Sequence, residues 1–164
     1  MTIPVYLSRK FGKPTESDLQ LQKIVKEIMK EEEPLFKIKI KNLDVVIFDE
    51  GGWLEFFPHN TIANYNNKTK SNVGASRALL GLRKVYLTKI LHMNKEKIRQ
   101  IIKHELVHIK LNPDFKMQIP EHGKEFQRCA KKFGIAGENI YAKSYLPDPQ
   151  WKHFKKPNIK GRVD

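Results

Sequence analysis

The feature that most constrains the fold is the pattern His104-Glu105-Leu106-Val107-His108, which lies within a stretch that reads as one helix. Positions four apart on a helix lie one turn apart on the same face, so the two imidazoles can converge on one metal ion. Neutral imidazole nitrogen is a preferred zinc ligand, and a rigid helix fixes two such ligands in advance. The pattern therefore requires a fold that brings a third ligand to this helix.

The same three polar residues could also lie on a solvated helix face. Apolar residues recur at helical spacing over 95–111, Asn94 is a candidate N-cap, and Asn112-Pro113 ends the helix. Such a helix is buried, where histidines and a glutamate are costly unless hydrogen-bonded or bound to metal. Glu105 would then lie beside the metal, where a carboxylate can take a proton from water and pass it to a leaving amine. We therefore predict zinc-dependent peptide-bond hydrolysis with Glu105 as the catalytic base.

A second helix is predicted from Pro120, with Gly134 at its C-terminal end. Four of its residues fall on one stripe: His122, Phe126, Cys129 and Phe133. This stripe can pack on the first helix and bring His122 to the metal as third ligand. Cys129 is then a core residue rather than a nucleophile or a ligand.

A glutamate is a rival third ligand. Glu121 and Glu125 flank His122, and gluzincin proteases use a glutamate from a second helix in this role. Acidic residues at a helix start are also favourable with the helix dipole alone. We favour His122, and a latent gluzincin-like peptidase that uses Glu121 or Glu125 remains an alternative.

Length and composition limit the remaining possibilities. The 164 residues fit one domain, and 31 Lys and Arg against 18 Asp and Glu give a net charge of +13. This excess favours polyanions, nucleic acid first, although a bias toward lysine would produce it too. Cys129 is the single cysteine, which excludes a disulfide framework and a four-cysteine zinc ribbon. Without a signal peptide or a long apolar run, we expect an intracellular, cytoplasmic protein, or a nucleoid or nuclear one if it associates with DNA, and no membrane partner.

The first part of the chain predicts a helix followed by strands. Thr15 and Asp18 are spaced as a helix-capping pair, Pro34 ends this helix, and its acidic end at 31–33 is interpreted as a solvated face. Four segments are predicted as strands, at 35–41, 45–48, 53–57 and 82–88. With a turn at 49–52, the first three suggest an antiparallel meander. The expected fold class is α+β, with helices packed on a small antiparallel sheet.

Two polar segments are candidates for binding. Residues 59–76 read as a long loop, in which Lys68 and Lys70 could contact substrate or nucleic acid, or which could be a plain insertion. We divide the chain into a domain, 1–140, and a basic tail, 141–164, in which aromatic residues alternate with lysines as in single-stranded nucleic-acid binders. The tail supplies nucleic-acid candidates at Lys152, Lys155 and Lys156, and candidate oxyanion donors by residue type at Tyr141, Tyr145 and His153. A tail docked near the site could instead make the protein latent.

The two histidine motifs, His104-Glu105-Leu106-Val107-His108 and His122-Gly123-Lys124-Glu125-Phe126, together resemble the SprT-like zinc metalloprotease family, which includes the Spartan proteases. In that family an HExxH helix is followed by an HGxxF helix start that supplies the third histidine, and residues 84–88 are similar to the strand before the active helix. The resemblance covers about residues 82–134. It implies a zincin-like fold, one zinc ion held by the three histidines, and Glu105 as general base.

The resemblance also implies association with DNA, since Spartan-type members cleave proteins crosslinked to it. This chain lacks the cysteines of the zinc ribbon found in many relatives, so its DNA partner is inferred from charge alone. We predict a zinc metalloendopeptidase with a protein or peptide substrate and with DNA-associated or DNA-crosslinked proteins as candidates. The alternatives are a nucleic-acid-binding protein with a non-catalytic zinc site and a regulatory protein that keeps the zinc fold without activity.

Overall fold

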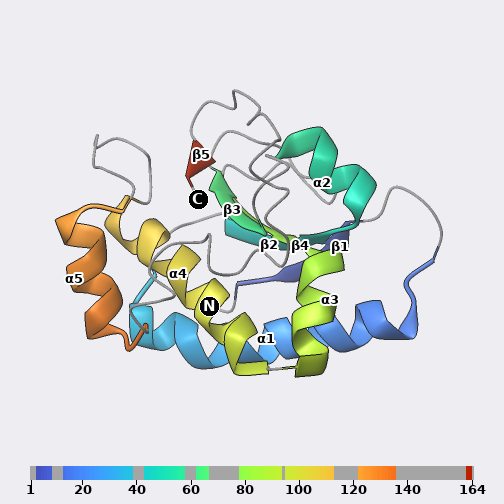
Figure 1. Ribbon diagram of the computed structural model, residues 1–164, viewed down its shortest axis with the longest axis horizontal. Coiled ribbons are helices and arrows are strands. Elements are labelled where there is room, and N and C mark those ends of the chain that lie inside the picture. The colour runs from blue at the N-terminus through green and yellow to red at the C-terminus, as the bar shows by residue number, and fades with distance from the viewer. Residues whose placement is uncertain are drawn as a thin grey trace.

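The computed structural model describes residues 3–8, 13–38, 43–57, 62–66, 78–93, 95–112, 122–135 and 162–163 (Figure 1). The helices are α1 (Glu16–Phe36), α2 (Glu50–Phe56), α3 (Lys84–Met93), α4 (Lys95–Leu111) and α5 (Lys124–Lys132). The strands are β1 (Val5–Ser8), β2 (Leu43–Phe48), β3 (Ala63–Asn66), β4 (Ala78–Arg83) and β5 (Arg162–Val163). The mixed helix and strand content agrees with the predicted α+β class.

All five strands form one sheet, in the order β1-β2-β4-β3-β5. β1 pairs with β2 in parallel, and β2 pairs with β4 in parallel. β3 runs antiparallel to β4 on one side and to β5 on the other. The prediction of an antiparallel sheet is therefore wrong. The sheet is mixed because α1 carries the chain from β1 to β2 in the same direction, and such crossovers produce parallel pairs.

The sheet has helices on both faces (Figure 1). One face packs against α1, α3 and α4 through the larger hydrophobic core, which contains Val45, Leu80 and Tyr65 from the strands. The other face is covered by α2. A second core cluster lies there, made of Val46, Phe48, Trp53, Phe57 and Leu79. Alternate residues of β2 thus enter different cores, as the two-residue period of a strand requires.

Helix α1 begins as predicted and ends later. The Thr15 hydroxyl accepts a hydrogen bond from the Asp18 amide, and the Asp18 carboxylate accepts one from the Thr15 amide. The helix continues through Pro34 to Phe36 and ends where Lys37 takes a left-handed conformation with φ 53°. The predicted strand at 35–41 is therefore wrong over its first residues, and its last three residues, 39–41, lie outside the described part.

The predicted turn and strand at 49–57 are wrong, because this segment forms α2. Asp49 is the N-cap, and its carboxylate accepts a hydrogen bond from the Gly52 amide. Trp53 and Phe57 are four residues apart, so in a helix both rings point toward the sheet, where they stack with centroids 4.4 Å apart.

Two further boundaries differ from the predictions. β4 covers 78–83, so only the first two residues of the strand predicted at 82–88 belong to it. The other five belong to α3, which separates the strand from α4. The resemblance of 84–88 to a strand is thus not borne out. Within the polar stretch predicted as a loop, residues 63–66 form β3. Across the described ranges, no helix combines the length and apolar character that a bilayer crossing needs.

Candidate metal centre

Helix α4 carries the two histidines of the first motif and is fixed on several sides. It packs against α1, α3, α5 and β3. Arg99 forms ion pairs with Glu31 at 2.6 Å and with Glu32 at 3.0 Å. Glu32 is buried by this contact, so the acidic end of α1 is only partly the solvated face expected from the sequence. These contacts tie the N-terminal half of α4 to α1.

The predicted burial of α4 is confirmed. Its apolar residues Ile98, Ile101, Ile102, Leu106 and Ile109 are all buried. The same burial encloses the polar residues of the motif: His104 is 0%, Glu105 1% and His108 5% exposed. Polar groups on such a helix are costly to bury unless they interact with one another or with a ligand.

His122 directly precedes the N-cap of α5, and its side chain extends to the two histidines of α4. Gly123 is that N-cap, and α5 packs on α4. The Gln127 side-chain amide donates a hydrogen bond to the carbonyl oxygen of His122 at 3.1 Å. This bond holds the backbone of His122 against the first turns of α5.

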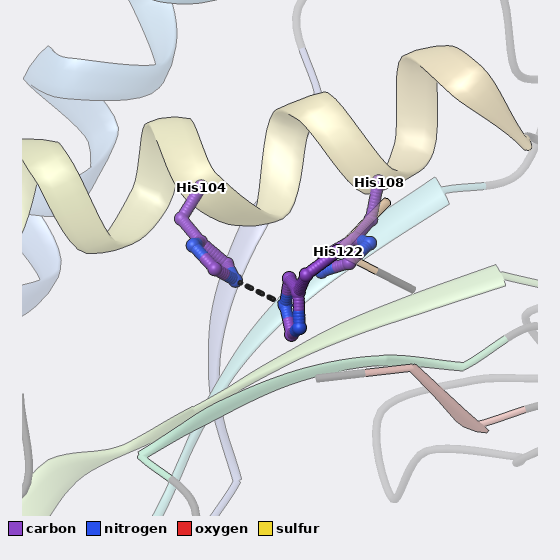
Figure 2. Close-up of side chains that lie close together, drawn as sticks. All are labelled: His104, His108 and His122. Atoms are coloured by element: carbon purple, nitrogen blue, oxygen red, sulfur yellow. Dashed lines mark hydrogen bonds between the residues drawn. The ribbon is translucent and has the colours of Figure 1, made fainter. Parts of the chain in front are cut away.

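The three imidazoles form a nearly regular triangle (Figure 2). Each pair of ring centroids, among His104, His108 and His122, is 5.1 Å apart. Their nitrogen ligand atoms all lie within 4.8 Å of one another, and the Nε2 atoms of His104 and His122 are 3.2 Å apart. In Figure 2 the rings of His104 and His108 extend from α4 toward the strands and meet the ring of His122 below the helix.

This arrangement fits a bound metal ion. Ligands at about 2.0–2.1 Å from a tetrahedral zinc ion lie about 3.3 Å from each other, close to the distance between His104 and His122. Imidazole donors suit zinc and also copper, iron and nickel, so the donor set does not identify the metal. The three histidines can hold a metal ion together.

Phe126 packs against all three imidazoles. Its ring centroid lies 4.9 Å from that of His104, 4.5 Å from that of His108 and 4.9 Å from that of His122. The residue is 1% exposed and comes from α5, one turn after His122. The sequence marks it as part of the apolar stripe and as the last residue of the second histidine motif, and its four-residue spacing from His122 places both on one face of the predicted helix.

Glu105 follows His104 directly on α4 and is buried with it. Of the two glutamates considered as rival ligands, the structure describes Glu125, which is exposed on the first turn of α5. The described residues that can jointly hold a metal ion are the three histidines, and Glu125 is not among them.

Cys129 is half-buried on α5 and packs against the larger core. Burial raises the pKa of its thiol, although the nearby charges of Lys110 and Lys132 lower it in part. A raised pKa leaves less of the reactive thiolate at neutral pH. This agrees with the predicted packing role.

Several predicted residues lie outside the described part of the chain. They are the helix boundaries Asn94, Pro113 and Pro120, the rival ligand Glu121, the loop lysines Lys68 and Lys70, the tail lysines Lys152, Lys155 and Lys156, and the oxyanion candidates Tyr141, Tyr145 and His153. Of the predicted tail, 141–164, the structure describes Arg162 and Val163, which form β5.

The fold and the site define the class of this protein: a mixed α/β domain with a buried three-histidine cluster able to hold a metal ion. The family model described as the SprT-like family matches residues 53–145, more than half of the 164 residues. The chain therefore belongs to the SprT-like family, as its two histidine motifs predict. The match begins within α2 and runs through α5, and it leaves β1, α1, β2 and β5 outside it. No curated protein and no solved structure matched the chain.

Proposed function

We propose that this protein is a zinc metalloendopeptidase with a zincin-like active site. His104, His108 and His122 would hold one zinc ion, and Glu105 would be the general base. The observation that carries this proposal is the triangle of buried imidazoles, with all three ring centroids 5.1 Å apart. Three histidines suit a catalytic site, since structural zinc sites have four protein ligands and catalytic ones have three.

When bound, zinc supplies a Lewis acid that polarises a carbonyl group and makes water more acidic. The protein residues supply the proton transfers and the positioning. Glu105 lies between the two α4 histidines in sequence, is 1% exposed and shares their helix. Its carboxylate accepts a proton from the attacking water and donates it to the departing amine. Because Glu105, His104 and His108 share α4, the helix backbone sets the position of this carboxylate relative to the two histidines.

We propose DNA-associated or DNA-crosslinked proteins as the substrates. The support is the net charge of +13, which favours association with a polyanion. Lys68, Lys70, Lys152, Lys155 and Lys156 are the proposed phosphate contacts, and Tyr141, Tyr145 and His153 are the proposed oxyanion donors. A protein of this kind would act where the nucleoid or nucleus presents protein bound to DNA.

Replacement of Glu105 by Gln tests the proposal. We expect wild-type protein loaded with zinc to cleave casein and a chelator to abolish this cleavage. Glu105→Gln should keep one equivalent of zinc and lose about 10²–10⁴-fold in kcat, the usual contribution of a general base. Glu96→Gln is the matched control, because Glu96 is an exposed acid on the same helix. Metal binding with salt-dependent DNA affinity and no cleavage by wild type would instead support a nucleic-acid-binding protein with a non-catalytic zinc.

A further inference from the structure

Strand β3 lies against the helix that carries His104 and His108. α4 packs against β3, and Ala63 and Tyr65 of β3 share the larger core with Ile102 and Leu106 of α4. In Figure 2 the imidazoles of His104 and His108 extend from α4 toward the strands and meet that of His122, and in this view β3 and β5 lie on the side of His122 away from α4. β1, the strand at the opposite edge, is separated from β3 by β2 and β4.

The outer side of β3 is paired with a segment from the far end of the chain. Arg162 and Val163 form β5, which runs antiparallel to β3, with Val163 opposite Tyr65 and Arg162 opposite Asn66. Almost one hundred residues separate the paired strands in sequence. The chain thus supplies its own extended segment to the edge beside the site.

A strand edge is also what an extended peptide uses to bind. The row of backbone N–H and C=O groups on an edge strand can pair with any extended backbone, with little dependence on sequence. The edge can hold one such strand at a given position. A substrate pairing there and β5 therefore exclude each other.

We propose that Arg162–Val163 is a built-in competitor of the extended substrate backbone for the outer edge of β3. This inference rests on the proposed peptidase function. β5 spans two residues, so at most about two backbone hydrogen bonds join it to β3. Each of these hydrogen bonds adds only modestly to the stability of the β3–β5 pairing in water. The competition therefore weakens substrate binding about three- to tenfold and leaves the protein active.

Two double variants of the full chain test this competition. R162P/V163P removes both backbone N–H groups and cannot pair as a strand. R162A/V163A keeps the backbone groups and removes the side chains, so it is the matched control. With casein as substrate, we expect the proline variant to show a three- to tenfold lower KM with unchanged kcat. The alanine variant should match wild type.

A binding measurement separates this inference from the proposed function. The same double variants are made in the Glu105→Gln background, and a fluorescein-labelled casein peptide is titrated by fluorescence anisotropy. We expect the proline variant to bind the peptide three- to tenfold more tightly than its alanine counterpart, even if no variant cleaves casein. Equal affinities would overturn the competition, and so would an equal gain in both variants. Casein cleavage by wild type with equal peptide affinities would leave the peptidase in place and remove β5 as its competitor.

Discussion

The two faces of the sheet bury different kinds of side chain. The face covered by α2 holds an apolar cluster of Val46, Phe48, Trp53, Phe57 and Leu79. The face covered by α4 buries His104, Glu105 and His108 among aliphatic side chains. Residues of both groups are almost completely enclosed. Burial alone therefore does not mark a site, whereas burial of clustered donor atoms does.

The α2 face is stabilised by close aromatic packing. Phe48 meets Phe57 edge-on at 5.3 Å, and Trp53 stacks on Phe57 at 4.4 Å. Gly81 of β4 permits this approach, since a Cβ there would lie 2.7 Å from the Cζ atom of Phe57. On the α4 face, by contrast, the ring of Phe126 packs against the three imidazoles. The comparison predicts that substitutions on the two faces affect different properties.

The largest effect on metal binding short of removing a ligand is expected from Phe126→Leu. Loss of the ring leaves the three imidazoles free to rotate, so zinc affinity should fall about ten- to a hundredfold, as for other groups that orient metal ligands. Competition with a chelating dye measures this affinity. Phe133→Leu is the control, because Phe133 stacks on Phe36 at 4.0 Å and also holds α5 in place. If both variants lose zinc affinity equally, Phe126 acts only through helix packing.

Gly81→Ala should disrupt the aromatic packing on the face covered by α2. The added methyl group must displace Phe57 and Trp53, and overpacking of this kind lowers the free energy of unfolding by about 1–3 kcal/mol. Urea denaturation measures the loss, and zinc affinity of the folded variant should stay at the wild-type value. Gly51→Ala is the control on α2, because Gly51 is exposed in a helix and the substitution should not destabilise. A Gly81→Ala protein with unchanged stability would refute the steric role of Gly81.

The smallest effect is expected from Asp18→Asn, which tests how a buried carboxylate outside the histidine cluster contributes to stability on the α4 side of the sheet. Burial raises the pKa of Asp18, but the hydrogen bond and charge of Lys84 and the hydrogen bonds with Thr15 lower it further, so the net pKa lies below its usual 3.8. A lowered pKa stabilises the fold above the unfolded value, and this stabilisation is lost as pH falls through the folded value. Asp18→Asn should therefore cost about 1 kcal/mol at pH 7 and progressively less below about pH 4.

Thermal denaturation across this pH range measures the difference, with exposed Glu16→Gln as control. A constant difference between wild type and Asp18→Asn down to pH 2 would contradict the assignment.

The site helix and α1 can be predicted from the sequence because their signals are local. The capping pair Thr15 and Asp18 and the helical spacing of apolar residues in α4 depend on neighbouring residues alone. His122 also has a local signal, in its position at the start of the next helix. The arrangement of the three rings follows from those two helices packing together.

The sheet could not be predicted in the same way. The two glycines before Trp53 suggest a turn, yet Asp49 caps a helix there because Trp53 and Phe57 then pack on the sheet together. The direction of β1 and β2 depends on a crossover through α1, which no local pattern records. The pairing of β3 with β5 joins segments that nothing in the sequence links.

Zinc binding by the full chain tests the central claim most directly. Equilibrium dialysis followed by elemental analysis should find one zinc ion per wild-type chain, and less than a tenth of that in His104→Ala, His108→Ala and His122→Ala at the same free zinc concentration. Glu125→Gln should keep the wild-type amount, because that residue is exposed away from the cluster. Retention of full zinc binding by His122→Ala, or its loss in Glu125→Gln, would contradict the three-histidine centre.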